Sequence, residues 1–307
     1  MRLGTSAAAI FLVVTFSAAR AQLKSVAERL GYPPDSKLLI IHADDLAVSH
    51  AEDAASFDAL DRHAVTSASI MVPCAWLTEV AEYAKGHPDA DLGLHLTLTA
   101  EWKTDRWGPT ESRDKVPSLL DADGYLWPDV PPAIQHIKAD EAEREIRAQI
   151  EHAIAMGIHP THLDSHMGTL FARADLMAAY VKVAHDYKLP FLGMLTPNVP
   201  PDVKALFSDK DVLLDSVVIA NPSVQSANWN NFYLDTIKNL KPGLTEIIVH
   251  LAYDDAESRA VMVDHVDYGA AWRKRDYDAI TSSEFKKALE DNHIVLVHWS
   301  DLKKLSN

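Results

Sequence analysis

Two adjacent carboxylates, Asp44 and Asp45, follow the short apolar run at 37–41. Neighbouring side chains on an extended strand point to opposite faces, so these two groups are predicted to have different roles. One can bind a divalent metal ion, while the other acts as a base beside it. Because aspartate is also a common N-cap, the pair taken alone is more typical of a solvated loop or the start of a helix than of a metal site.

Imidazole and carboxylate groups alternate along a second segment, where His162, Asp164 and His166 would share one face of a strand. Burying three such groups together costs free energy unless they are paired or bind a metal ion. His95 lies in the apolar segment 94–96, where a lone histidine is more often a hydrogen-bonded core residue than a ligand. One carboxylate with two imidazoles is the pattern of a catalytic metal site, because water can occupy an open position.

These residues need secondary structure that brings them together, and short apolar runs alternate with amphipathic stretches along the chain. Strands are predicted at 37–41, 66–72, 91–98, 159–166, 191–194, 213–219, 245–250 and 294–298. Helices are predicted at 50–62, 77–85, 139–156, 176–187, 232–240 and 283–291. Alternating strands and helices without a glycine-rich phosphate loop favour an α/β barrel over a dinucleotide-binding sheet. In a barrel, the ends of the strands form the active-site face.

Composition narrows the class of partner. The chain has 307 residues and a formal charge of −15. An acidic protein repels phosphate backbones, so nucleic acid is not expected as a partner. Cys74 is the only cysteine and follows an apolar run, which predicts a buried thiol and no internal disulfide. The sequence leaves the oligomeric state open, including a homo-oligomer.

The first residues have the pattern of a secretory signal. Arg2 supplies a positive charge, residues 7–16 are almost entirely apolar, and Ala19-Arg20-Ala21 fits a cleavage site. We therefore expect residues 1–21 to be a signal peptide and residues 22–307 to form a single periplasmic or secreted domain with no membrane span. An uncleaved N-terminal anchor is the alternative.

Four sequence blocks resemble the YdjC-like carbohydrate deacetylases, a family that includes chitooligosaccharide deacetylases. The blocks are residues 42–46, 65–71, 93–99 and 161–166, and they occur in the family's order. The resemblance extends over roughly residues 37 to 300. It implies a deformed, TIM-like (β/α) barrel and the hydrolysis of an N-acetyl amide on a small sugar or an oligosaccharide.

The resemblance also implies roles for individual residues. Asp45, His95 and His166 would bind the divalent metal ion, either zinc or magnesium. Asp44 would be the general base that activates water. His250 would act as the acid or orient the substrate.

Substrate contacts are predicted for His162, Asp164 and Trp102. Trp102 lies in residues 101–135, a stretch with several tryptophans among Pro, Asp and Gly, which we interpret as a long insertion or lid. Its indole could stack on a sugar ring, although anchoring of the loop is an equally good interpretation.

Three departures from the family pattern fall around the expected substrate. The family commonly has Asn where His42 stands, a further His where this chain has Met167-Gly168, and Pro-Gly in place of Leu251-Ala252. They leave room for a metal-dependent esterase or amidase that acts on a non-sugar substrate. A catalytically inactive carbohydrate-binding relative is a third possibility, one that would bind glycans without releasing product.

Overall fold

The strands of the protein form one parallel sheet. The computed structural model describes residues 24–194 and 199–305, so the predicted signal peptide at 1–21 lies outside the described residues. The strand order is β4-β3-β2-β1-β6-β5, with β7 also pairing with β1. The strands are β1 (Lys37–Leu46), β2 (Ser67–Ile70), β3 (Leu92–Leu96), β4 (Leu163–Ser165), β5 (Ser216–Ile219), β6 (Gly243–His250) and β7 (Val295–Leu296).

The sheet curls until its two edges are linked through residues 191–194. Leu163 in β4 forms an isolated parallel bridge with Phe191, and Met194 forms another with Leu214, just before β5. The predicted strand at 191–194 is thus reduced to single bridges. The prediction of an α/β fold with a deformed barrel is confirmed, with this weak seam as its irregular part.

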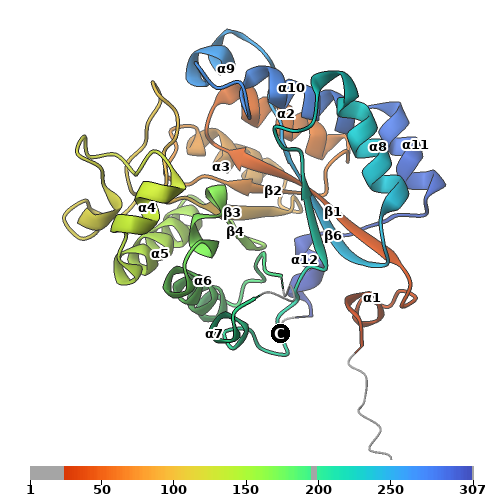
Figure 1. Cartoon of the computed structure of the whole chain (residues 1–307), viewed down its shortest axis with the longest axis horizontal. Helices are drawn as coiled ribbons and strands as arrows, with labels where there is room; N and C mark the ends of the chain where they lie inside the picture. The colour runs from red at the N-terminus through yellow and green to blue at the C-terminus, as the bar shows by residue number, and fades with distance from the viewer. Residues whose placement is uncertain (1–23, 195–198, 306–307) are drawn as a thin grey trace, which may run out of the picture.

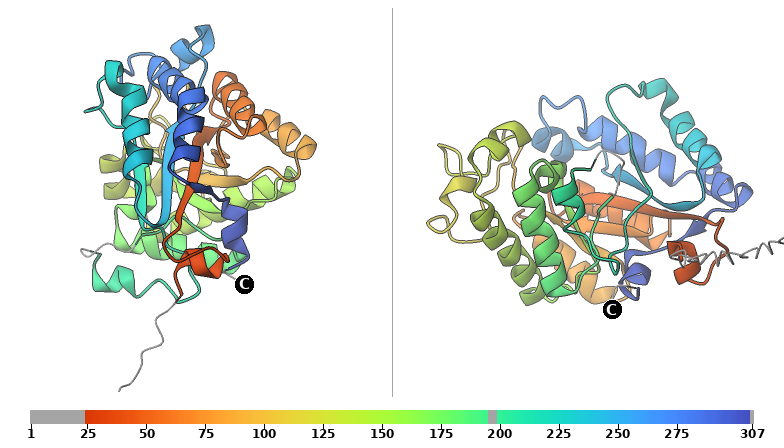
Figure 2. Two further views of the ribbon diagram at one scale, coloured as in Figure 1. Left: turned by 90° about the vertical axis from the view of Figure 1, so that its right-hand side faces the viewer. Right: turned by 60° about the horizontal axis from the view of Figure 1, so that its bottom comes forward.

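Helices lie around the outside of the strands (Figures 1 and 2). They are α1 (Val26–Arg29), α2 (His50–Asp61), α3 (Leu77–Gly86), α4 (Val130–His136), α5 (Ala139–Ala155), α6 (Ala174–Tyr187), α7 (Pro201–Lys204), α8 (Trp229–Asn239), α9 (Ala256–Val261), α10 (Ala270–Ile280), α11 (Ser283–Asp291) and α12 (Trp299–Lys303). Short 3₁₀ turns are η1 (Pro117–Leu119), η2 (His166–Phe171) and η3 (Ser226–Asn228). Within the described residues, no helix has the length and apolar character needed to cross a membrane.

Helix α10 is absent from the sequence-based prediction, and its buried face explains why. Arg273 and Asp276 are both buried on that face, next to Trp272 and Ala279. Charged residues at core-facing positions interrupt the apolar period by which an amphipathic helix is recognised. Arg273 and Asp276, which α10 contributes to the site, are therefore the residues that obscure its helical pattern in the sequence.

Strand β1 is buried along its length and has two different sides. Leu39 and Ile41 belong to the main apolar core, whereas Leu38 and Ile40 pack in a second cluster with Trp299 of α12. Side chains alternate along a strand, so the side that carries Leu38 and Ile40 continues through residues 42 and 44. The apolar end of this side thus leads directly into polar residues at the end of the strand.

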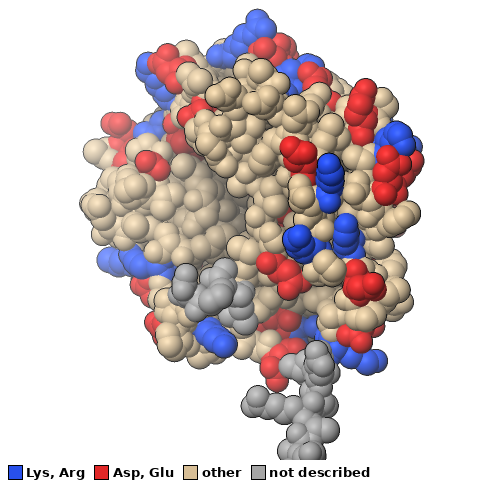
Figure 3. All heavy atoms as spheres, turned by 45° about the vertical axis from the view of Figure 1, so that its right-hand side comes forward, with Lys and Arg blue, Asp and Glu red and all other residues tan. Residues whose placement is uncertain are grey.

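The insertion at 101–135 is anchored to the rest of the fold. Thr99, just before the insertion, forms a bridge with Trp127 inside it, and the Trp107 indole N–H donates to the Thr99 carbonyl at 2.8 Å. Cys74 is buried, as predicted. On the face drawn in Figure 3, acidic and basic side chains are intermixed over the surface.

Candidate metal and catalytic site

Three side chains from three strand ends converge on one small volume. The Asp45 Oδ1 atom lies 3.3 Å from His95 Nε2 and 3.4 Å from His166 Nδ1. All three residues are buried, and their potential ligand atoms lie within 4.8 Å of one another. Asp45 belongs to β1, His95 to β3 and His166 follows β4, so the parallel sheet brings together residues that are far apart in the sequence.

The backbone at Asp45 departs from a regular strand and corrects one prediction. Asp45 has a φ of 70°, and the register with β2 shifts between Ala43 and Leu46. Asp44 and Asp45 therefore do not point to opposite sides of the sheet. Asp44 Oδ2 lies 3.7 Å from His95 Nε2, the same nitrogen that faces Asp45. A positive φ is costly for a residue other than glycine, and such strain is concentrated at functional sites.

The donor set fits a divalent metal ion. Asp45 Oδ1 is buried and has no hydrogen-bond partner, although it faces two imidazole nitrogens. The other oxygen, Oδ2, lies 2.8 Å from Arg273 Nη1. Burial alone would raise the pKa of Asp45, but Arg273 and the two histidines hold it well below its usual value. A carboxylate oxygen and two ring nitrogens left facing one point are a suitable ligand set for zinc.

Two further carboxylates set the orientation of the histidines. The His95 Nδ1–H group lies 2.6 Å from Asp164 Oδ1, which leaves Nε2 to face Asp45. His166 is held by its other nitrogen, Nε2, 2.9 Å from Glu101 Oε2. Such second partners fix the ring and increase the basicity of the ligand. Glu101 was not predicted, because it lies in an irregular insertion where no periodic pattern marks it.

The pKa of His166 implies that metal binding depends on pH. Burial lowers this pKa, but Glu101 and Asp45 raise it to about 9, so the ring carries a proton at pH 7. A metal ion must displace that proton. We expect the Kd for zinc to fall at least about tenfold per pH unit between pH 6 and 8. Competition titrations with a chromophoric chelator would measure this slope, and an affinity independent of pH would contradict it.

Asp44 lies beside Asp45, His95 and His166, the three predicted ligands. Its Oδ1 atom lies 3.0 Å from His42 Nε2 and accepts a hydrogen bond from Ser69 Oγ at 3.3 Å. Its Oδ2 atom is directed toward His95 and lies 4.0 Å from His250 Nε2. Oδ1 is therefore held by His42 and Ser69, whereas Oδ2 faces His95 and His250.

His250 completes the group from the end of β6. Its Nε2 atom lies 3.9 Å from Asp45 Oδ2, and its backbone N–H donates to Asp276 Oδ2 at 3.1 Å. Burial lowers the pKa of His250 to about 4, with Arg273 acting in the same direction. The imidazole is therefore neutral at pH 7 and can accept a proton.

The residues predicted to bind substrate lie deeper than expected. His162 has no exposed surface and stacks on Trp299 at 4.9 Å between ring centroids, and Asp164 lies behind His95. Trp102 is 1% exposed, with the Arg273 guanidinium 5.4 Å from its ring. These contacts place Asp164 beside a predicted metal ligand and Trp102 beside Arg273, and direct substrate contact for all three residues stays a prediction.

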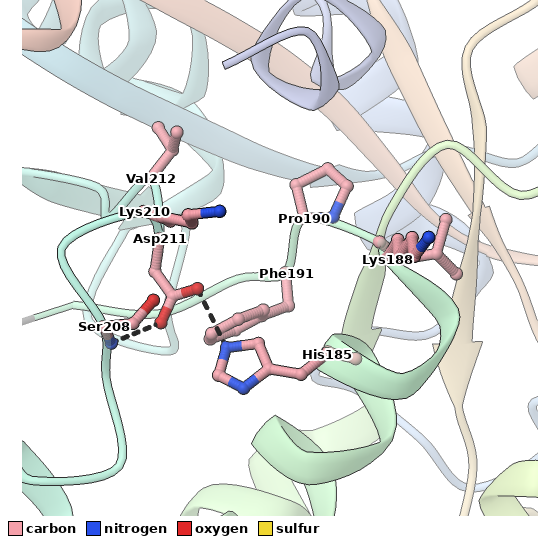
Figure 4. A pocket seen from close by; sticks show the side chains of 10 residues that line it. His185, Lys188, Pro190, Phe191, Ser208, Lys210, Asp211 and Val212 are labelled. Atoms are coloured by element: carbon pink, nitrogen blue, oxygen red, sulfur yellow. Dashed lines mark hydrogen bonds and ion pairs between the residues drawn. The ribbon is translucent and has the colours of Figure 1, made fainter. Parts of the chain in front are cut away.

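A separate cavity of about 440 Å³ lies between the C-terminal end of α6 and residues 208–212. At its wall, His185 is hydrogen-bonded to Asp211 at 2.9 Å (Figure 4). The cavity adjoins Phe191, where the segment 191–194 begins, so it lies away from the strand ends that carry Asp45 and its partners. None of the potential metal-binding groups among the described residues lies there.

Comparison with known proteins places this geometry in context. Residues 38–291 match the family model described as YdjC-like protein. The chain is 33% identical over 278 residues to a carbohydrate deacetylase from Thermus thermophilus, covering 87% of this chain and 94% of the relative. It is 27% identical over 269 residues to a carbohydrate deacetylase from Thermoanaerobacter pseudethanolicus, covering 87% of this chain and 100% of the relative.

A solved structure shares the fold. It is that of a candidate cellobiose-phosphate cleavage protein from Enterococcus faecalis, with a TM-score of 0.72 and 25% sequence identity. The match covers 87% of this chain and 99% of that chain.

Proposed function

The chain belongs to the YdjC-like protein family, and from this premise we propose that it is a metal-dependent carbohydrate deacetylase. It would hydrolyse the amide bond of an N-acetylated sugar or oligosaccharide and release acetate. The observation that carries the proposal is the buried, unpartnered Asp45 Oδ1 facing His95 and His166, with Asp44 beside them. The curated relatives with 33% and 27% identity over most of the chain support the substrate class.

Asp45, His95 and His166 would hold the metal ion. Two imidazoles and one carboxylate suit zinc, whereas magnesium usually takes more oxygen ligands, so zinc is the first candidate and magnesium the second. When bound in such a site, a divalent ion lowers the pKa of a water ligand and polarises a carbonyl group.

The remaining chemistry belongs to Asp44 and His250. Asp44 Oδ2 would accept a proton from the attacking water, since Oδ1 is already occupied by His42 and Ser69. His250 is neutral in the resting site, so it can protonate the leaving amine only after it has received a proton. Asp44, 4.0 Å away, can supply that proton.

Acetate release is the experiment that tests this function. The mature protein, residues 22–307, would be assayed on N-acetylglucosamine, chitobiose and longer chitooligosaccharides, with and without a chelator. We expect acetate release that a chelator abolishes and that zinc or magnesium restores, the more effective ion identifying the cofactor.

The same assay includes the outcome that would refute the proposal. If the protein binds the metal ion tightly but releases no acetate from any of these sugars, the deacetylase function is wrong. Turnover of simple esters or non-sugar amides would then support a different metal-dependent hydrolase.

A further inference from the structure

We propose that His42 is a positioning residue for this reaction, which ties the general base Asp44 to the carboxylate that orients the metal ligand His95. The inference rests on the proposed function and names how two parts of the site are held together. His42 itself would touch neither the substrate nor the metal ion.

A single nitrogen of His42 makes the connection. Its Nε2 atom lies 3.0 Å from Asp44 Oδ1 and 3.0 Å from Asp164 Oδ2. The other oxygen of Asp164 lies 2.6 Å from His95 Nδ1. The His42 imidazole thus connects Asp44, the proposed base on β1, to Asp164 on β4. Asp164 in turn contacts His95, the proposed metal ligand on β3.

The surroundings of His42 show that this contact is specific. Its side chain has no exposed surface. The Ser69 hydroxyl lies 3.0 Å from the same Nε2 atom, and Glu246 Oε1 lies 3.7 Å from Nδ1 on the other side of the ring. The His162 ring packs edge-on against it, 5.0 Å between centroids. The imidazole is therefore held by hydrogen bonds at Nε2 and by the packing of His162, while Nδ1 has no hydrogen-bond partner.

Charge explains why an imidazole is needed there. The carboxylates of Asp44, Asp164 and Glu246 lie 3.0, 3.0 and 3.7 Å from the ring nitrogens. Burying these groups without a cation is costly, because water cannot solvate them. Burial lowers the pKa of His42, but Asp164 and Asp44 raise it well above the usual value, so these carboxylates favour the cationic form of the ring.

The expected consequence is a loss of kcat with little change in KM. His42 is buried beneath the reactive groups, so replacing it would not remove a substrate contact. It would free the Asp44 carboxylate to rotate away from its position beside His95 Nε2. It would also allow Asp164, and therefore His95, to move. Loss of a residue that hydrogen-bonds a metal ligand typically lowers metal affinity about 10- to 100-fold.

A double-mutant comparison tests the connection. His42→Leu removes the contacts of Nε2 with both carboxylates, whereas His42→Gln keeps an N–H donor near the position of Nε2. At saturating zinc, we expect His42→Leu to lower kcat about 50-fold with KM within about twofold, and His42→Gln, which restores an N–H donor but no charge, to recover part of that loss. In an Asp44→Asn background, the same His42→Leu change should lower the residual kcat by less than about twofold.

Zinc affinity provides a readout that does not depend on the substrate. His42→Leu should raise the Kd for zinc about tenfold, while His152→Gln, an exposed histidine on α5, should leave both the Kd and kcat unchanged. An unchanged zinc Kd in His42→Leu, or an equal loss of kcat with and without Asp44, would overturn the proposal. If His42→Leu does not fold, as judged by circular dichroism, His42→Gln and Ser69→Ala give the same comparison with smaller effects.

Failure of the deacetylase function would be recognised separately. In that case the wild-type protein releases no acetate, but the shift in zinc affinity between wild type and the His42 variants is still measured. A shift without acetate release would refute the proposed function and leave the positioning of His95 through Asp164 intact.

Discussion

Replacing Asp44 with Asn is expected to lower kcat for acetate release by about a thousandfold while zinc remains bound. A general base contributes about 10² to 10⁴ to the rate, and Asn cannot accept the proton from water. The amide oxygen of Asn can still accept the hydrogen bond from His42, so the local structure should persist. Steady-state kinetics at saturating zinc, together with the metal content of the purified variant, would measure both parts of the prediction.

Asp89→Asn is the matched control for this change. Asp89 is an exposed aspartate near the end of α3, so the same loss of charge there should leave kcat within about twofold. If Asp44→Asn keeps near wild-type activity, the assignment of Asp44 as the base is wrong. If it loses both activity and zinc, Asp44 instead contributes to binding the metal ion.

Replacing His166 with Gln is expected to weaken zinc binding at least about a hundredfold and to abolish turnover at substoichiometric zinc. The reason is the loss of one of three ligands, which should cost more than the loss of a partner behind a ligand. His166 is a better choice than Asp45 for this test. The buried Arg273 pairs with Asp45 and Glu52, so replacing Asp45 would also remove one of its two acidic partners. Zinc titration by calorimetry measures the change.

Glu101→Gln separates binding of the metal ion from orientation of its ligand. It removes the carboxylate that lies 2.9 Å from His166 Nε2 but leaves the imidazole in place. The zinc Kd should rise only about tenfold, and it should depend less on pH, because the pKa of His166 is no longer raised by Glu101.

A His166→Gln protein that binds zinc as tightly as the wild type would exclude His166 from the ligand set.

The arrangement of the site explains why these effects should differ in kind. Asp45 offers one oxygen to the metal position because Arg273 occupies the other. Asp44 offers one oxygen to the water position because His42 and Ser69 hold the other. In the proposed mechanism, the two neighbouring carboxylates thus receive separate roles from their partners, and only secondarily from their order in the sequence.

Several partners in the site could not be predicted because their surroundings give them no pattern in the sequence. Arg273 is a buried cation on α10. The core-facing side of this helix carries charged residues, so it lacks the apolar period of a helix that packs on a core. Glu101 begins an irregular insertion, and Ser69 lies in a strand where a small hydroxyl side chain is unremarkable. Each acquires its function only from the charged group that the fold places beside it.

Local patterns in the chain were enough to identify the residues at the strand ends. Apolar runs that end in Asp44-Asp45, in His95 and in Asp164-Ser165-His166 predict parallel strands whose polar ends meet, because strand periodicity and burial are local properties. The tertiary structure alone decided how these residues are used. The positive φ at Asp45 turned two carboxylates toward the same histidine, and the buried position of Trp102 withdrew it from the surface. Both depend on contacts between distant segments, which no local pattern in the chain specifies.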